Sequence, residues 1–274
     1  MTEVIDVHQH VGAPAALTGS GVEQPLDDEV RGRVGAMDAF GVDWAVIQPT
    51  QMYLRPAGNR DTMALNDSVA KLRALAPERF RVAVGTVEPL TGAQGLTEVN
   101  RCMEELGLHG MSWHHRFQGC YIDTPLMRPL LARLAELEGV AIIHVNSESK
   151  LEAAWRLAKL AREFPQIEFV ALDAFFSFEE SEHALDICER VPNILWDLGG
   201  PLLSWPAAWA MVESWILEHG AHRLAFSADI GYGRSPLQRP HLLDRILESG
   251  LTDDDKAAIL GANARRVFAR FLNG

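Results

Sequence analysis

The amino-acid sequence predicts an α/β fold, a single (β/α)8 TIM barrel with an additional C-terminal helix. Short, mostly apolar runs rich in β-branched residues alternate with amphipathic segments, and this alternation occurs eight times in 274 residues. Strands that are buried on both faces have such continuous apolar runs, as in parallel sheets. At about 34 residues per unit, the spacing fits a (β/α)8 barrel better than an open doubly wound sheet.

The predicted strands are bounded by polar residues, Gly or Pro. They are residues 4–7, 44–47, 82–85, 110–113, 140–143, 169–172, 194–196 and 224–227. A Ser or Thr followed three residues later by Glu or Gln predicts a helix start, as does a cap residue before Pro. These signals are Thr91 with Gln94, Ser149 with Glu152, Ser177 with Glu180, Thr124-Pro125 and Ser235-Pro236, and the final helix follows Thr252. No linker or repeat divides the chain, so we expect one domain over residues 1–274, with a loop at residues 49–59 over the barrel mouth.

Composition excludes several classes of partner. With 25 Lys and Arg against 37 Asp and Glu, the formal net charge is −12, which disfavours nucleic acids and anionic membrane surfaces. No apolar run approaches the length of a transmembrane helix, and no signal peptide is recognisable at the N-terminus. The three cysteines, Cys102, Cys120 and Cys188, form no CxxC motif. We therefore expect a cytoplasmic protein with reduced thiols that acts on a small molecule.

Histidines and carboxylates gather where the predicted strands end, which is where active sites lie in such barrels. His8 and His10 end the first strand, and a period of two places both side chains on one face. His144 ends the fifth strand, Asp173 the sixth and Asp229 the eighth. This mixture of imidazoles and carboxylates favours Zn²⁺, Fe²⁺ or Mn²⁺ over the oxygen-only sites of Ca²⁺ and Mg²⁺.

Four motifs resemble the amidohydrolase superfamily, in the branch that contains aminocarboxymuconate semialdehyde decarboxylase and resorcylate decarboxylases. They are residues 5–10 (IDVHQH), 142–144 (IIH), 223–229 (RLAFSAD) and 259–268 (ILGANARRVF). The resemblance implies a barrel whose divalent metal is held by His8, His10, His144 and Asp229. It also implies that Asp229 accepts a proton from a metal-activated water. Asp6 has the strand parity of the two histidines, and we expect it to be a buried hydrogen-bond acceptor.

The sequence departs from this family at two positions. Asp173 stands where the family usually has a catalytic or second-metal His, and Ser112 stands where members with two metals have a carbamylated Lys. Asp173 is a candidate metal ligand or general base, or else a helix-capping acid or a partner of Arg116. His114 and His115 follow the fourth strand, and we expect at least one of them to be a metal ligand or proton donor.

Candidate substrate-binding residues lie at the same rim. Arg116 is suited to a carboxylate or phosphate, although a salt bridge to a neighbouring acid is the alternative. An apolar or aromatic pocket wall is predicted from Tyr53, Arg55, Trp113, Tyr121 and Trp205. Trp209 and Trp215 fall in a helical pattern and are assigned to the core or to an interface, so that the segment from Trp205 to Trp215 is a candidate homodimer contact.

These residues support several functions. The leading hypothesis is a metal-dependent hydrolase of an ester, lactone or amide bond in a small carboxylic compound. Decarboxylation is the neighbouring alternative, weakened by the missing His. A non-haem diiron monooxygenase is an alternative from another class, because the rim offers more ligands than one hydrolytic metal needs. The last alternative is an inactive barrel that serves as a subunit of an active homologue.

Overall fold

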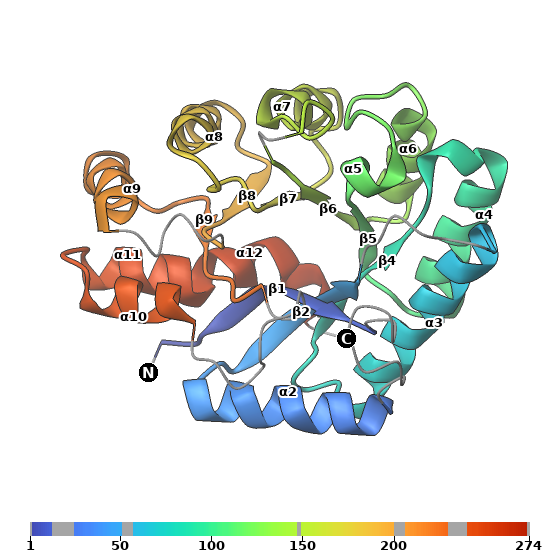
Figure 1. Ribbon diagram of the computed structural model, residues 1–274, viewed down its shortest axis with the longest axis horizontal. Coiled ribbons are helices and arrows are strands. Elements are labelled where there is room, and N and C mark those ends of the chain that lie inside the picture. The colour runs from blue at the N-terminus through green and yellow to red at the C-terminus, as the bar shows by residue number, and fades with distance from the viewer. Residues whose placement is uncertain are drawn as a thin grey trace.

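The computed structural model describes residues 2–12, 25–50, 57–146, 149–199, 206–229 and 240–272. Parallel strands form a barrel with helices outside it, as predicted (Figure 1). The strands are β1 (Ile5–Val11), β2 (Trp44–Pro49), β3 (Val82–Ala83), β4 (Gly85–Thr86), β5 (Gly110–Trp113), β6 (Val140–His144), β7 (Phe169–Leu172), β8 (Ile194–Asp197) and β9 (Leu224–Ala225). Their order is β1-β2-β3 and β4 to β9, and only Val84 separates β3 from β4. Val7 N–H donates to the Phe226 carbonyl (3.2 Å), which links β1 to the segment after β9.

Helices surround these strands, and the C-terminal helix packs against the interior side chains (Figure 1). They are α2 (Leu26–Phe40), α3 (Asn59–Leu75), α4 (Ala93–Asn100), α5 (His115–Gln118), α6 (Met127–Glu136), α7 (Ala154–Glu163), α8 (Phe178–Arg190), α9 (Pro206–His219), α10 (His241–Glu248), α11 (Asp253–Ala257) and α12 (Asn263–Phe268). No helix among the described residues is long and apolar enough to cross a membrane.

One predicted helix cap, Ser177, is confirmed, and a helix follows Thr252 as predicted. The Ser177 hydroxyl accepts from Glu180 N–H before α8, and the Thr252 hydroxyl accepts from Asp255 N–H before α11. Satisfying these free amide groups favours helix formation at those positions.

Three other predicted caps are wrong, and Ser235 lies outside the described residues. The N-cap of α4 is Gly92, because the Thr91 hydroxyl donates to the Glu88 carbonyl instead. Helix α6 begins two residues after Pro125. Helix α7 begins at Ala154, because the Glu152 carboxylate accepts from two histidine rings rather than from its own helix start.

Two apolar layers separate the inside of the barrel from its helices. The inner layer includes Val46, Val84 and Ile142, and the outer layer includes their strand neighbours Ile47 and Ala83. Strand alternation produces this division. The inner layer also contains Ala264, Val267 and Phe268 of α12, so the C-terminal helix packs against the interior side chains.

The β1 strand changes the direction of its side chains halfway along. Ile5 and Val7 belong to the inner apolar layer, and the register with β2 shifts between Asp6 and Gln9. The parity argument for Asp6 is therefore wrong, since such an irregularity re-aims the residues beyond it. Asp6 is nevertheless a buried acceptor: its Oδ1 accepts from His8 N–H (3.1 Å) and Ala228 N–H (2.9 Å). Burial raises its pKa to about 6 despite these hydrogen bonds.

We predict that Asn263→Leu destabilises the barrel. The buried Asn263 amide donates to the Ala221 and Leu224 carbonyls (2.5 and 3.0 Å), tying α12 to the start of β9. Leaving two buried carbonyls without these donors should cost about 2–3 kcal/mol, or roughly 4–10 °C in Tm. Calorimetry measures the Tm of Asn263→Leu, with Glu105→Gln, a substitution at an exposed position, as the control. An equal Tm in both variants would contradict the prediction.

We also predict a stability loss on acidification that depends on His109. Its Nδ1 accepts from Ala83 N–H (3.1 Å), and burial together with Arg73 lowers its pKa to about 4. Because the unfolded chain protonates this ring near pH 6.5, the stabilisation is full above that pH and is lost as pH falls towards 4. Denaturant unfolding in EDTA should therefore show a smaller decline from pH 7 to pH 4 in His109→Asn than in the wild type. Parallel pH profiles would exclude the effect.

Candidate metal centre

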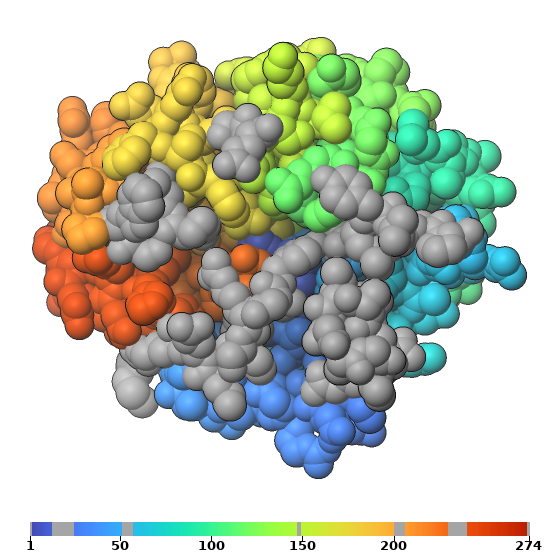
Figure 2. Space-filling view, in the orientation of Figure 1, coloured from blue at the N-terminus to red at the C-terminus, as the bar shows by residue number. Residues whose placement is uncertain are grey.

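Histidines and aspartates from several strands meet at the carboxyl end of the barrel. His8 Nε2 and His10 Nε2 on β1 lie 2.9 Å apart, and His8 Nε2 lies 3.6 Å from Asp229 Oδ1 in the segment after β9. His144 Nε2 at the end of β6 lies 3.1 Å from Asp173 Oδ2 after β7. In the space-filling view, the colours of β1 and of the segment after β9 meet near the centre of the visible face (Figure 2). The structure thus brings His8, His10 and Asp229 together, and it places Asp173 against His144 and within reach of His8.

The rings of His8 and His10 are both held at their Nδ1 atoms. His8 Nδ1 lies 2.9 Å from Asp197 Oδ2, and His10 Nδ1 lies 3.1 Å from the Pro49 carbonyl. An acceptor at Nδ1 fixes the proton there and leaves the Nε2 lone pair available, which is the usual arrangement of a metal-ligating histidine. Two such lone pairs facing each other at 2.9 Å are suited to a shared cation.

Glu152 holds the other two histidines in the same way. Its Oε1 accepts from His114 Nδ1 (2.8 Å) and from Arg116 N–H (2.9 Å), and its Oε2 accepts from His144 Nδ1 (3.0 Å). The two imidazoles stack with their centroids 3.6 Å apart. One buried carboxylate therefore orients two rings, and His114 is the member of the His114-His115 pair that joins the cluster.

The electrostatics at His8 and His144 favour positive charge. Burial alone lowers the pKa of His8, but Asp173, Asp229 and Asp197 outweigh it and raise that pKa to about 10. Burial is likewise outweighed at His144, whose pKa rises to about 9 beside Asp173 and Glu152. The pKa of Asp173 is lowered despite its burial, mainly by His8 and His144. Carboxylates that stabilise cationic imidazoles so strongly are also suited to a divalent cation.

Two of the carboxylates occupy backbone conformations that favour Gly. Asp173 has a φ of 61° and Asp229 a φ of 46°. Asp tolerates this left-handed region better than most residues, and such conformations concentrate at functional sites. Asp173 N–H donates to Asp197 Oδ1 (3.0 Å), and Asp6 accepts from the amide of Ala228, the residue before Asp229. Neighbouring acids therefore hold both turns in place.

Sequence reasoning missed Asp197 and Glu152. Asp197 directly follows the apolar run of the seventh predicted strand, so the signal that identified Asp173 was present there too. Glu152 was interpreted as half of a capping box, and nothing local in the sequence distinguishes that role from a buried acceptor. Its function depends on contacts with β5 and β6.

Two other predicted site residues, His115 and Arg116, do not contribute side-chain atoms to the groups of metal-ligand atoms within the residues that the structure describes. His115 is fully buried at the start of α5 and belongs to none of the groups of metal-ligand atoms found among the described residues. Burial lowers its pKa to about 3. Arg116 reaches Glu152 through its backbone, while its guanidinium lies over Phe117. No ion pair of the Arg116 side chain with Asp173 is found in the described part of the chain.

Of the predicted pocket-wall residues, Trp113 lines a small cavity at the cluster. Trp113 is buried in the outer apolar layer, and Tyr121 is 45% exposed beneath the Arg156 guanidinium. Tyr53, Arg55 and Trp205 lie outside the described residues. The substrate-binding roles of these residues, and of Arg116, stay predictions.

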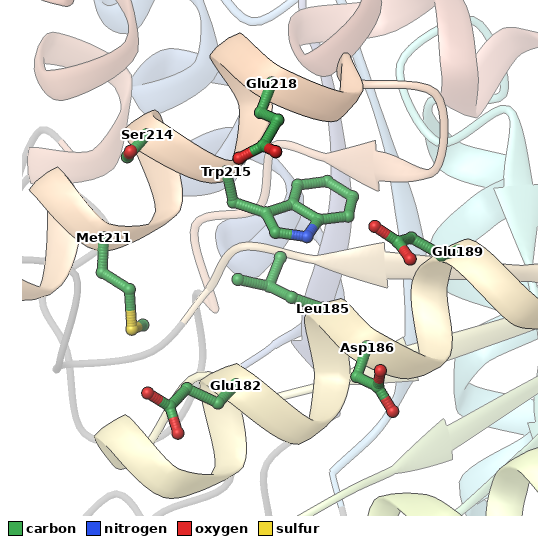
Figure 3. A pocket seen from close by; sticks show the side chains of 8 residues that line it. All are labelled: Glu182, Leu185, Asp186, Glu189, Met211, Ser214, Trp215 and Glu218. Atoms are coloured by element: carbon green, nitrogen blue, oxygen red, sulfur yellow. The ribbon is translucent and has the colours of Figure 1, made fainter.

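One surface hollow lies away from this cluster. It measures about 430 Å³ and lies between α8 and α9, where Trp215 stands among the carboxylates of Glu182, Asp186, Glu189 and Glu218 (Figure 3). Trp209 is buried in the core, whereas Trp215 is half-buried in this groove. A much smaller cavity of about 10 Å³ lies within the cluster itself, lined by His10, Gln48, Ser112, Trp113, His114, His144 and Leu172.

The fold and the cluster define a class, the (β/α)8 barrels that bind a divalent metal at the carboxyl ends of their strands. The chain belongs to the amidohydrolase family, since the family described as Amidohydrolase matches residues 5–270. This confirms the family that the sequence motifs indicated. A search of the curated proteins finds no match.

Solved structures share the fold at low sequence identity. 5-Carboxyvanillate decarboxylase from Sphingomonas paucimobilis has a TM-score of 0.72 at 19% identity, covering 98% of this chain and 99% of that one. 4-Oxalomesaconate hydratase from Rhodopseudomonas palustris has a TM-score of 0.71 at 18% identity, covering 97% and 96%. An uncharacterised TIM-barrel protein from Bordetella bronchiseptica has a TM-score of 0.71 at 16% identity, covering 98% and 99%. These likenesses concern the fold.

We predict that Glu152→Gln weakens metal binding without unfolding the protein. The amide has one acceptor oxygen, so it can accept from only one of the two Nδ1 atoms, and the other ring loses its orientation. Loss of such a supporting acceptor typically costs 10- to 100-fold in metal affinity. Chelator competition followed by elemental analysis measures it, with Glu105→Gln as the matched control. Wild-type affinity in Glu152→Gln would show that the carboxylate does not orient the ligands.

Proposed function

We propose that the protein is a metal-dependent hydrolase that cleaves an ester, lactone or amide bond in a small carboxylic compound. The observation that carries this proposal is the pair of facing Nε2 atoms of His8 and His10, fixed at Nδ1 and flanked by Asp229. The donor set of imidazoles and carboxylates suits Zn²⁺, Fe²⁺ or Mn²⁺. A similar solved structure, a dihydroxybenzoic acid decarboxylase, is described with bound manganese.

His8, His10, His144 and Asp229 would hold the ion, and Asp173 lies beside them. Such an ion supplies Lewis acidity towards a carbonyl oxygen and makes a water molecule more acidic. Asp229 is suited to receive the proton, because its Oδ1 faces His8 and its side chain is 14% exposed, within reach of water. The hydrogen bond from Ala228 N–H to Asp6 keeps the turn before Asp229 in place. The buried Asp197 and Glu152 act through the rings that they orient.

Decarboxylation is the second candidate. Several of the similar structures are named as decarboxylases, among them those of 5-carboxyvanillate and of 2,6-dihydroxybenzoate, and both names denote aromatic carboxylates. Asp173 distinguishes the candidates in this chain. It stands where the family resemblance implies a catalytic His, and a carboxylate bonded to His144 cannot donate a proton as an imidazolium would.

A two-metal centre is the third candidate, and it corresponds to the diiron monooxygenase hypothesis. His114 and His144 are both bonded through Nδ1 to Glu152, so both Nε2 atoms are left for a ligand, and Asp173 lies against one of them. These atoms, together with His8, His10 and Asp229, provide more ligands than one hydrolytic ion needs. The number of ions bound therefore separates this candidate from the first two.

Metal analysis combined with activity assays tests the proposal. We expect about one Zn²⁺ or Mn²⁺ per chain, hydrolysis of members of an ester, lactone and amide panel, and loss of both in His8→Ala. Release of CO₂ from hydroxybenzoates would instead support decarboxylation, and two irons with O₂ consumption would support hydroxylation. Metal content that is unchanged in His8→Ala would overturn the ligand assignment. Glu105→Gln, purified in the same way, is the control for metal lost during preparation.

A further inference from the structure

Gln48 is a buried polar residue next to the metal centre that the proposed function does not use. It lies on β2, where its Cα pairs with that of His10 on β1, and it follows Val46 of the inner layer by two residues. Strand alternation therefore directs its side chain to the inside of the barrel. Gln48 is only 3% exposed, and its buried Nε2 has no acceptor in the part of the chain that the structure describes.

The cavity of about 10 Å³ beside Gln48 has room for roughly one oxygen atom of a water or ligand. The hydroxyl and imidazole side chains on its wall already have hydrogen-bond partners. The Ser112 hydroxyl donates to the Gly85 carbonyl (3.1 Å), and the Nδ1 atoms of His114 and His144 are bonded to Glu152. Gln48 thus contributes a donor that lacks a protein acceptor among the described residues. The indole N–H of Trp113 lacks one too, but its side chain packs in the outer apolar layer. A buried donor left in this state is unfavourable, and an oxygen atom in the cavity would offset that cost.

We propose that Gln48 donates a hydrogen bond to one oxygen atom of the substrate, a carboxylate or carbonyl oxygen placed in this cavity. The inference rests on the proposed function, which supplies the small carboxylic substrate. Gln48 carries no charge, and neighbouring strands hold it beside His10, so its N–H is fixed before a ligand arrives. A fixed donor of this kind stabilises negative charge on a substrate oxygen more effectively than mobile water does. Gln48 is therefore a substrate-binding residue on the β2 side of the centre.

The test measures by calorimetry how tightly the zinc-loaded wild type and its variants bind acetohydroxamate, a small oxygen ligand. Gln48→Met keeps the length of the side chain but removes the donor, and we expect affinity to fall about tenfold, the equivalent of one hydrogen bond. Gln48→Glu places a carboxylate there, and we expect a loss of at least about a hundredfold from repulsion between anions. Glu105→Gln, at an exposed position that does not line the cavity, should stay within about twofold of the wild type.

Zinc content and Tm are measured for each variant, so that lost metal or lost folding is separated from a lost contact. Equal acetohydroxamate affinity in the wild type and Gln48→Met, with zinc retained, overturns the inference and assigns the cavity to an ordered water. That result leaves the hydrolase proposal standing, since the ester, lactone and amide panel tests it separately. Conversely, absence of hydrolysis with a tenfold weaker Gln48→Met complex overturns the proposed function while supporting Gln48 as an oxygen-binding residue.

Discussion

The hydrogen bonds that hold the Nδ1 atoms of four histidines are the constraint on which the functional centre depends. Each ring could otherwise rotate and exchange its proton between two nitrogens. Asp197, the Pro49 carbonyl and Glu152 remove that freedom for His8, His10 and the stacked pair. The Nε2 atoms of His8 and His10 on β1 are consequently held side by side. A metal ion that binds there would find these rings already oriented.

Burying the carboxylates of this arrangement costs free energy, and hydrogen bonds within the barrel offset that cost. Buried carboxylates such as Asp197 and Glu152 are unfavourable unless they are paired and fully hydrogen-bonded. Each accepts from groups on more than one element: Asp197 from His8 and the Asp173 amide, Glu152 from two rings and a backbone amide. Two apolar layers and the α12 side chains keep the strands in register beneath them. Asp197 also holds the left-handed turn at Asp173, and Asp6 holds the one at Asp229.

Much of the fold could be predicted because its signals are local. Every predicted strand overlaps an observed one, since a strand buried on both faces must be apolar along its length. Helix starts were less predictable. Ser177 caps α8 as expected, whereas Ser149 and Glu152 do not cap α7, because the Glu152 carboxylate is more stable between two imidazoles than at an exposed helix end. A pattern of three residues carries no information about such distant partners.

The sequence by itself determined the barrel, the family and the candidate ligands His8, His10, His144 and Asp229, because strand ends in a (β/α)8 barrel converge on one rim. Only the tertiary structure decided which neighbours support them. In the folded chain His114, rather than His115, joins the cluster. Asp197 and Glu152 contact the imidazole rings, and Gln48 lines a small cavity. The physical reason is that ring orientation and hydrogen-bond satisfaction depend on atoms from different strands. These atoms become neighbours only when the barrel closes between β1 and the segment after β9.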